Sequence, residues 1–448
     1  MKTCSFKETE AFSVCARMPK KNNKQVLVVQ SAGNTARAFA QVCSDNRIPV
    51  VICVPEDSLH DLWFSKKLNK CVKLVTVPHG CDYYDAISIG EKLAEDPGFI
   101  LEGGAKKKKS LGQFFTEDSC WLQPQVREFI EKSGCEIAYD PFAGSGCLFA
   151  PVTNSIASVT LCKGLDIDPT LGWEVNDSLV RIPSVDGAII ITNPPYISNY
   201  SASRKRLSCE LKKYFDSTEY DDVYLLALDR MLEAQRNVVA IIPETFINSA
   251  FKKKHLLKSI TILEENPFKD TDTPVVVVCF DSIDKSFEEV DVYKGATRVC
   301  SFGDVEKCRL IPDNSVAMKF NDPSGWLGVR CVDTTDPSDM LRFDFKECID
   351  YDWENGIKVS SRLLTLVAID VPIELRRRFV NSCNDILSKL RQDSHDIMLS
   401  PFKGNMKNGV RRRRLDFQTC RAIIEIAYGR TVKKKAKVVQ SRLFKEVV

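Results

Sequence analysis

The residues with the clearest chemical character are Asn193, Pro194, Pro195 and Tyr196, which directly follow the apolar run GAIIIT. Consecutive prolines cannot donate ladder hydrogen bonds and restrict the preceding residue, so a strand must end there in a rigid, extended turn. The Asn193 amide oxygen and the Pro194 main-chain carbonyl can both accept hydrogen bonds from one exocyclic amino group. Such acceptors stabilise the positive charge that grows on nitrogen during methyl transfer. The Tyr196 ring offers a face on which a planar base can stack.

A glycine-rich segment upstream, DPFAGSG at 140–146, predicts a second part of the same site. It follows a short strand-like run at 137–139 and precedes a helix-like segment. Glycines at 144 and 146 allow the backbone to bend sharply and to approach a ligand, as in dinucleotide-binding loops. A nucleotide-like cofactor is therefore the first candidate ligand, and an ordinary strand-to-helix turn is the alternative.

Acidic residues follow the next strand-like runs. About 20 residues beyond the glycine-rich segment, a carboxylate at the end of the second strand can meet ribose hydroxyls. Asp166 is our choice for this role, and Asp168 is the alternative. Asp177, which closes the segment before the NPPY strand, could accept a hydrogen bond from an adenine amino group, although a solvated turn explains it as well.

The elements that must position these residues form two series of alternating strands and helices. Residues 24–95 read as a βαβαβ unit, with strands at 25–30, 50–56 and 73–77. The polar stretch 103–110 has the composition of a linker. After it come a helix at 124–132, strands ending before 140, at 158–161 and at 188–192, a helix at 223–236, and strand VVAII.

The predicted fold class is α/β. We expect a Rossmann-like class I methyltransferase domain at 106–285, an N-terminal α/β fragment at 1–105, and a C-terminal mixed α+β DNA-recognition region at 286–448. Beyond about residue 280 the patterns weaken and Asp-Pro and Asp-Asn turns appear, which is typical of a mixed accessory domain.

At these motifs the sequence resembles the S-adenosylmethionine-dependent DNA methyltransferases that modify adenine N6. The shared blocks, in chain order, are LGQFFT at 111–116, DPFAGSG at 140–146, GLDIDP at 164–169, NDSL at 176–179 and NPPY at 193–196. Their order resembles the gamma arrangement of modification methylases, with the cofactor motifs first and target recognition last. The resemblance covers residues 109–280 by motif and 281–448 only by position and charge.

The resemblance implies roles for individual residues. S-adenosyl-L-methionine would be the methyl donor, and Asn193, Pro194, Pro195 and Tyr196 would be catalytic. The residues implied for cofactor binding are Phe115, Thr116, Asp140, Phe142, Ala143, Gly144, Gly146, Asp166 and Asp177. Phe268 would stack on the target base across from Tyr196, with a core phenylalanine as the alternative. Adenine N6 lies inside the duplex, so the base would be flipped out before transfer.

The first hundred residues resemble a different family, the fold-type II pyridoxal-phosphate enzymes near threonine synthase and cysteate synthase. The matching segments are SFK ending at Lys7, QSAGNT containing Asn34, and LEGGA at 101–105. In such enzymes the lysine forms a Schiff base and the asparagine loop contacts the cofactor. Only part of such an enzyme is present, without a phosphate cup, so we expect a fused remnant that does not hold pyridoxal phosphate and that exposes apolar surface.

Charge is concentrated at the C-terminal end of the chain. Residues 401–448 contain 14 Lys or Arg and three Asp or Glu, whereas the whole chain carries a net charge of +3. The run Arg411, Arg412, Arg413 and Arg414, followed by Lys433, Lys434, Lys435 and Lys437, is predicted to neutralise phosphates of double-stranded DNA. A solvated face or tail is the alternative interpretation.

Composition excludes several other classes of protein. The apolar runs have strand length, so we expect no membrane span, and no apolar leader precedes a cleavage site, which favours the cytoplasm. The 18 cysteines are scattered without CxxC spacing, which indicates reduced thiols. None of the four histidines pairs with a cysteine at zinc-ligand spacing, so no metal is expected.

The leading hypothesis is therefore a site-specific, adenine-specific DNA methyltransferase, the modification component of a restriction-modification system. No nuclease motif is recognisable, so a cognate restriction endonuclease would be a separate polypeptide. The alternatives are a methyltransferase acting on RNA or on a protein glutamine, a pyridoxal-phosphate-dependent synthase served by the N-terminal fragment, and a degenerate nucleic-acid-binding protein.

Overall fold

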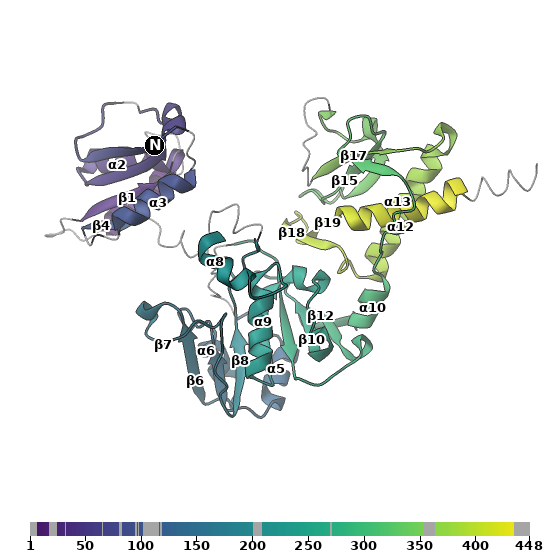
Figure 1. Cartoon of the computed structure of the whole chain (residues 1–448), viewed down its shortest axis with the longest axis horizontal. Coiled ribbons are helices and arrows are strands. Elements are labelled where there is room, and N and C mark those ends of the chain that lie inside the picture. The colour runs from purple at the N-terminus through teal and green to yellow at the C-terminus, as the bar shows by residue number, and fades with distance from the viewer. Residues whose placement is uncertain are drawn as a thin grey trace, which may run out of the picture. The chain divides into compact units, whose positions relative to one another are not determined.

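The structure, a computed structural model, divides the chain into two compact units (Figure 1). One unit comprises residues 1–113 and 197–213, and the other comprises residues 114–196 and 214–448. The described residues are 7–17, 25–31, 33–64, 66–79, 83–94, 96, 98–101, 116, 119–199, 208–268, 271–353 and 363–433. Phe115, most of LGQFFT, the linker, the glycines of LEGGA, and Lys434, Lys435 and Lys437 lie outside them.

The N-terminal unit contains a four-stranded parallel sheet in the order β3-β2-β1-β4. The strands are β1 (Val26–Gln30), β2 (Val50–Pro55), β3 (Val72–Val77) and β4 (Phe99–Leu101). The helices are α1 (Lys7–Arg17), α2 (Asn34–Asn46), the 3₁₀ helix η1 (Glu56–Asp61) and α3 (Tyr83–Ala94). The predicted βαβαβ order is confirmed.

Alternate residues of this sheet supply two hydrophobic clusters. Leu27 and Val29 belong to the cluster that includes residues of α1 and α2, whereas Val28 belongs to the cluster that includes α3. Because successive side chains of a strand point to opposite faces, both faces of the sheet are covered. Large apolar side chains are also exposed on this unit, among them Phe12 (51%) and Trp63 (53%).

The second unit is built around a nine-stranded sheet in the order β13-β12-β10-β11-β9-β8-β5-β6-β7. The strands are β5 (Ile137–Asp140), β6 (Leu161–Asp166), β7 (Glu174–Val175), β8 (Ala188–Thr192), β9 (Val238–Pro243), β10 (Leu257–Ile262), β11 (Val275–Phe280), β12 (Asp291–Lys294) and β13 (Thr297–Ser301). β11 runs antiparallel to its neighbours β9 and β10. Seven neighbouring strands of this sheet, in the order β7-β6-β5-β8-β9-β11-β10, have the arrangement expected of a Rossmann-like class I methyltransferase sheet, which confirms the predicted α/β fold class.

Strand order reverses at the centre of this sheet. β5 pairs in parallel with β6 on one side and with β8 on the other. The connecting helices include α5 (Pro124–Lys132), α6 (Phe149–Ser155) and α9 (Val223–Ala234), and the 3₁₀ helices are η2 (Pro169–Leu171), η3 (Glu244–Asn248) and η4 (Lys254–Leu256). Helix α8 (Ser208–Phe215) begins in the N-terminal unit and ends in the second unit. In open α/β sheets, ligands bind outside the carboxyl ends of the strands at such a switch point.

The second strand of this sheet differs from its predicted position. We expected a strand at 158–161, whereas β6 spans Leu161–Asp166. Pairing decides this, because Leu161 lies opposite Ile137 and Gly164 opposite Asp140. Gly164 also leaves space for the Trp173 ring, which a Cβ atom would approach to 2.5 Å. A strand that contains glycine and ends in aspartate carries little apolar signal of its own.

The C-terminal region is a mixed α+β structure, as predicted. Its four-stranded sheet has the order β14-β17-β15-β16, and β18 pairs with β19 in a separate antiparallel hairpin. The strands are β14 (Met318–Phe320), β15 (Leu327–Arg330), β16 (Arg342–Phe345), β17 (Leu364–Ile369), β18 (Ser400–Asn405) and β19 (Arg411–Arg414). The helices are η5 (Phe287–Glu289), α10 (Phe302–Lys307), η6 (Lys346–Cys348), η7 (Ile373–Leu375), α12 (Arg376–Asp393), α13 (Phe417–Tyr428) and a final turn at Gly429–Lys433. β12 and β13, which follow residue 285 in the chain, still belong to the central sheet. The domain boundary expected at residue 285 stays a prediction.

Replacing Gly164 by alanine should destabilise the second unit. The added methyl group would lie 2.5 Å from the Trp173 ring, and such overpacking costs about 1–3 kcal/mol of unfolding free energy. Urea unfolding followed by circular dichroism measures the loss. Gly429→Ala, which meets nothing within 4 Å, should be nearly neutral. Combining Gly164→Ala with Trp173→Leu should recover part of the loss, and equal stability of Gly164→Ala and wild type would contradict the packing argument.

Candidate active site

Asn193 follows directly after β8, at the carboxyl edge of the central sheet. Its amide nitrogen donates to the Thr116 hydroxyl over 3.3 Å, so two expected site residues meet here. The Tyr196 hydroxyl lies within hydrogen-bond distance of the Asn193 amide oxygen and, at 2.7 Å, of the Ile241 carbonyl. Burial raises the pKa of the Tyr196 phenol well above its usual range. The hydroxyl therefore stays protonated and has one proton for two acceptors.

The Tyr196 ring contacts the Phe268 ring, the predicted second stacking partner. Their centroids are 6.2 Å apart and the planes are inclined by 68°, an edge-to-face contact. Phe268 is 5% exposed and belongs to the hydrophobic core cluster against which Tyr196 packs. The structure thus brings the two rings together, but it does not present them as two parallel faces. Placing a base between them requires at least one ring to move.

The glycine-rich turn is held by the acid that ends β6. Gly144 and Gly146 have φ values of 53° and 76°, a region that glycine adopts without steric cost. The two Asp166 carboxylate oxygens accept hydrogen bonds from the Gly144 and Asp168 amides, at 2.8 and 2.9 Å. The Asp168 carboxylate instead accepts from Thr170 in the next turn. Of the two candidate acids, Asp166 therefore contacts the glycine-rich turn.

Asp140, at the end of β5, is buried beside the switch point. Its carboxylate accepts from the Thr192 hydroxyl at 2.5 Å and from the Phe142 amide at 2.9 Å. Burial raises the pKa of this carboxyl to about 7, although these two hydrogen bonds lower it and the charge of Asp166 raises it further. Thr192, which is fully buried at the end of β8, was not singled out in the sequence. Its place next to Asn193 was the available signal.

Trp173 is another contact that sequence reasoning missed. Its indole nitrogen donates to the Gly144 carbonyl over 2.9 Å, and its ring lies where Cβ atoms at Gly146 and Gly164 would have to be. Ala143, in the same turn, is 6% exposed and its amide donates to the Leu165 carbonyl. A tryptophan shortly after GLDIDP was the signal for this packing.

Asp177 accepts a hydrogen bond from the Tyr214 hydroxyl at 2.9 Å. The carboxylate is half-buried, and the main-chain carbonyl of Asp166 accepts from the neighbouring Asn176 amide. The segment is thereby tied to the end of β6, where Ile167 leaves an apolar side chain 52% exposed. The acid is placed near the predicted cofactor residues, and its predicted contact with adenine stays a prediction.

The arginine run does not form a uniform phosphate-binding surface, and the prediction is wrong for Arg413. This side chain is 2% exposed, and its guanidinium pairs with the buried Glu244 carboxylate at 2.5 Å. Arg411 donates to the Leu263 carbonyl over 2.9 Å, and burial lowers the pKa of its guanidinium. Alternate positions of β19 face opposite sides, so a basic sequence run was split between interior and surface.

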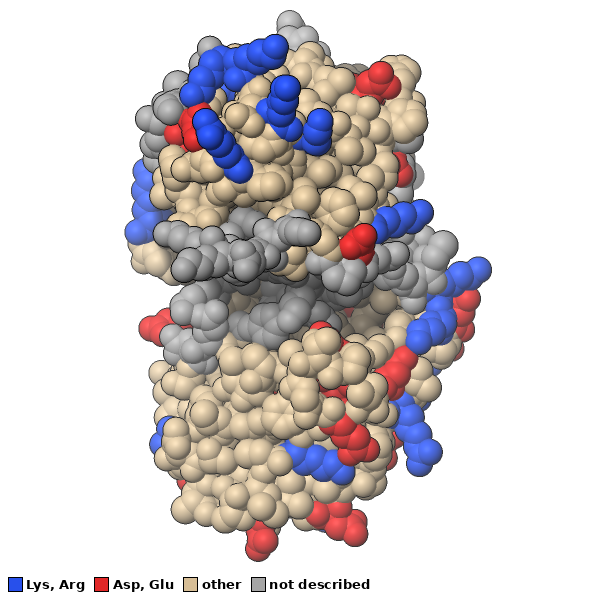
Figure 2. All heavy atoms as spheres, turned by 90° about the vertical axis from the view of Figure 1, so that its left-hand side faces the viewer, with Lys and Arg blue, Asp and Glu red and all other residues tan. Residues whose placement is uncertain are grey.

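Three further expectations concern metal ions, membranes and surface charge. No group of three or more His, Cys, Asp and Glu is placed there to hold a metal ion, and no helix there is long and apolar enough to cross a membrane. The described cysteines carry free thiols. On the face shown in Figure 2, Lys and Arg lie scattered among Asp and Glu on a mostly uncharged surface, so the described atoms in view form no continuous basic patch.

Comparison with known proteins separates the two parts of the chain. Residues 188–271, which contain NPPY and Phe268, match the model of the Eco57I restriction-modification methylase family. The central region is similar to restriction-modification methylases. A solved structure of a type I restriction-modification system methyltransferase subunit from Streptococcus thermophilus is 15% identical, covers 50% of this chain and 60% of its own, and has a TM-score of 0.28.

The N-terminal part is similar to cysteate synthases, as the motifs around Lys7 and Asn34 predicted. The match is 47% identical over 106 residues with the enzyme of Methanococcoides burtonii, 24% of this chain and 25% of that one. With the enzyme of Methanocella arvoryzae it is 43% over 138 residues, 30% of this chain and 33% of that one. The chain therefore spans a quarter to a third of the length of these relatives.

Stability should depend on pH through Asp140. Its pKa is about 7 in the folded protein against 3.8 normally, so the folded state binds this proton more tightly than the unfolded state. Unfolding free energy contributed by this group is therefore present below about pH 4 and lost as pH rises toward about 7. Asp140→Asn keeps an acceptor for Thr192 and Phe142 but cannot ionise.

Wild type should accordingly lose stability relative to Asp140→Asn as the pH rises from about 4 to about 7, by a few kcal/mol at most. Urea unfolding at a series of pH values measures the difference. Thr192→Val, which removes one hydrogen bond without removing the carboxyl, should retain the pH dependence. A constant difference between wild type and Asp140→Asn across this range would contradict the raised pKa.

Proposed function

We propose that this protein is a site-specific DNA methyltransferase that transfers a methyl group from S-adenosylmethionine to adenine N6, as the modification component of a restriction-modification system. The observation that carries the proposal is the placement of Asn193 and Tyr196 at the carboxyl edge of the sheet, beside Thr116. The match of residues 188–271 to the Eco57I restriction-modification methylase family supports it. Double-stranded DNA is the corresponding partner, and a separate endonuclease would cleave unmodified sites.

The residues around the switch point fit the methyl donor by their chemistry. Carboxylates of Asp166 and Asp177 can accept from the hydroxyl and amino groups of an adenosine moiety, and Asp140 lies at the adjoining strand end. The exposed Ile167 side chain offers an apolar surface to a planar ring. Bound there, S-adenosylmethionine supplies an electrophilic methyl group. Phe142, Ala143, Gly144 and Gly146 shape the turn that approaches it.

Asn193 performs the central step on the acceptor. Its amide oxygen accepts a hydrogen bond from the adenine amino group, with the Pro194 carbonyl as the second acceptor. These interactions would stabilise the positive charge that develops on N6 as the N–C bond forms and the S–CH3 bond of the donor breaks. S-adenosylhomocysteine would then be the leaving group, and N6 would lose one proton to water. The donation from the Asn193 amide nitrogen to Thr116 fixes the orientation of the amide and leaves its oxygen toward the Tyr196 hydroxyl. Holding the amine in line with the methyl group supplies the remaining rate advantage.

Tyr196 contacts the acceptor that this step needs. Its hydroxyl shares its proton between the Asn193 oxygen and the Ile241 carbonyl, so it uses one of the two lone pairs of the Asn193 oxygen. A flipped adenine would take over the Asn193 oxygen and stack on the tyrosine ring, while Ile241 keeps the phenolic proton satisfied. The cost of unstacking the base from the duplex is a few kcal/mol.

We also propose that the N-terminal unit does not perform pyridoxal-phosphate chemistry by itself. The chain spans only a quarter to a third of the cysteate synthases that it matches. The Lys7 ammonium pairs with Glu10, and the Asn34 side chain accepts from Arg37. We propose a cytoplasmic location for the chain, in which the described cysteines stay reduced.

The decisive test is methyl transfer from labelled S-adenosylmethionine to unmethylated duplex DNA, with RNA and protein as parallel acceptors, followed by nucleoside analysis. Label should appear as N6-methyladenine. Asn193→Ala should reduce transfer by at least about 100-fold, the usual cost of removing one charge-stabilising group, with cofactor affinity nearly unchanged. Label in RNA or protein would overturn the proposed function. An equal loss of cofactor affinity in Asn193→Ala would overturn the role given to Asn193.

Tyr196→Phe separates the ring from the hydroxyl. The variant keeps a stacking face and frees the Asn193 oxygen, so transfer should stay within about tenfold of wild type, while stability falls by about 1 kcal/mol because Ile241 loses its donor. Steady-state transfer and urea unfolding measure the two effects. Tyr196→Ala, the comparison variant, should lose far more activity. If Tyr196→Phe were as inactive as Asn193→Ala, the hydroxyl itself would take part in catalysis.

A further inference from the structure

The β18–β19 hairpin joins the C-terminal region to the carboxyl edge of the central sheet, the edge at which Asn193 lies. Residues 400–415 contain six Lys or Arg and no acid. The Arg411 guanidinium donates to the Leu263 carbonyl, just after β10. Asn248, at the end of η3, donates to the Met398 carbonyl over 3.1 Å, just before β18. These contacts place the hairpin beside the segment that leads to Phe268.

One face of the hairpin is an anchor. Arg413 donates to Glu244, which directly follows β9, and both side chains are almost fully buried. A buried charge is tolerated only when it is paired, so removal of either partner would leave an uncompensated charge. The Ile241 carbonyl, which contacts Tyr196, lies three residues before Glu244. The anchor therefore reaches the strand that supports the active site.

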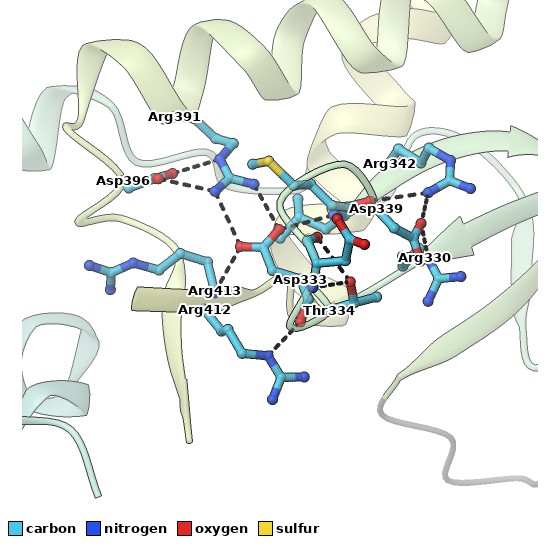
Figure 3. A network of polar contacts seen from close by, with 12 residues as sticks. Arg330, Asp333, Thr334, Asp339, Arg342, Arg391, Asp396, Arg412 and Arg413 are labelled. Carbon is cyan, nitrogen blue, oxygen red and sulfur yellow. Dashed lines mark hydrogen bonds and ion pairs between the residues drawn. The ribbon is translucent and has the colours of Figure 1, made fainter. Parts of the chain in front are cut away.

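Asp333 fixes the hairpin from its other edge (Figure 3). Its fully buried carboxylate accepts from the Arg413 amide at 2.9 Å and from both terminal nitrogens of Arg391, at 3.0 and 3.2 Å. Arg391 also donates to Asp396. Figure 3 shows that the side chains of Arg412 and Arg413 leave β19 in different directions. The main chain of β19 is thus held rigidly while its alternate side chains diverge.

The hairpin also carries cations that the anchor does not use. Lys403 on β18 and Lys407 in the turn that follows β18 are exposed. Arg412 is half-buried, and its guanidinium lies above the Phe402 ring, 4.8 Å from the ring centroid. The guanidinium also donates to the main-chain carbonyls of Asp333 and Lys403. Because these carbonyls carry no net charge, they do not neutralise the Arg412 cation. An acid, Asp336, lies near Lys407. Its pKa is lowered mainly by hydrogen bonds from Ser338 and to a smaller extent by the charge of Lys407.

We propose that the β18–β19 hairpin is a DNA-binding ribbon, in which Lys403, Lys407 and Arg412 contact phosphates while Arg411 and Arg413 anchor it. The inference rests on the proposed DNA substrate and assigns a binding element to it. A two-stranded antiparallel ribbon fits the major groove, and cations along it complement the phosphate backbone. Its position at the catalytic edge brings bound DNA to Asn193, where the flipped base is needed.

The test measures binding of the full chain to unmethylated duplex DNA by fluorescence anisotropy over a range of salt concentrations. The slope of log K against log salt should fall by about 2 to 3 in the Lys403→Gln, Lys407→Gln, Arg412→Gln variant, because each phosphate that is no longer neutralised lowers it by about 0.9. The Lys403→Gln, Lys407→Gln variant leaves every interaction of the Arg412 side chain intact. Its slope should fall by about 1 to 2, and it serves if the triple variant fails to fold.

The matched control replaces Lys132, Lys307 and Lys389 by glutamine. These side chains are 74%, 63% and 73% exposed and lie on α5, α10 and α12, so the control removes the same charge elsewhere. An unchanged control slope beside a reduced hairpin slope supports the ribbon. A wild-type slope in the hairpin variants, or an equal reduction in the control, overturns the ribbon alone. Absence of salt-dependent duplex binding by wild type overturns the ribbon and the DNA substrate together.

Discussion

The reversal of strand order between β5, β6 and β8 is the constraint on which the active site depends. Because β5 pairs in parallel with both neighbours, the residues that follow the three strands converge at one edge. Asp140, Asp166 and Asn193 are far apart along the chain, yet each directly ends or follows one of these strands. A shift of one residue in either pairing would turn their side chains to the opposite face.

Short polar contacts then fix the chemical groups at that edge. Thr192 holds Asp140, Thr116 holds the Asn193 amide, and Asp166 holds the glycine-rich turn through main-chain amides. Preorganised groups of this kind need no rearrangement when charge develops on a substrate. Tyr196 is the exception, since its hydroxyl donates to the same oxygen that a substrate amine would use. In the proposed reaction this hydroxyl turns to the Ile241 carbonyl, its second acceptor, when the substrate amine binds.

The chain also combines two separate sheets, a parallel one in the N-terminal unit and a mixed one in the second unit. The N-terminal sheet has clusters on both faces, so it possesses a core of its own, although it corresponds to only part of a cysteate synthase. The second unit carries the class I methyltransferase sheet and continues into the C-terminal region through β12 and β13. The buried Glu244–Arg413 pair ties that region to β9, which makes target recognition and catalysis parts of one body in our proposal.

The sequence by itself determined the elements and the identity of the candidate chemistry. Apolar runs such as VVAII and AIIIT predicted β9 and β8, and the prolines after Asn193 fixed the end of a strand, because these signals are local. Local signals did not decide where β6 starts or which arginines of the run are buried. Pairing with β5 sets the start of β6. Arg413 is buried because its side of β19 meets Glu244, whereas Arg412, on the opposite side, lies nearer the surface. Only the tertiary structure decides such cases, since burial of a charge depends on a partner distant in the sequence.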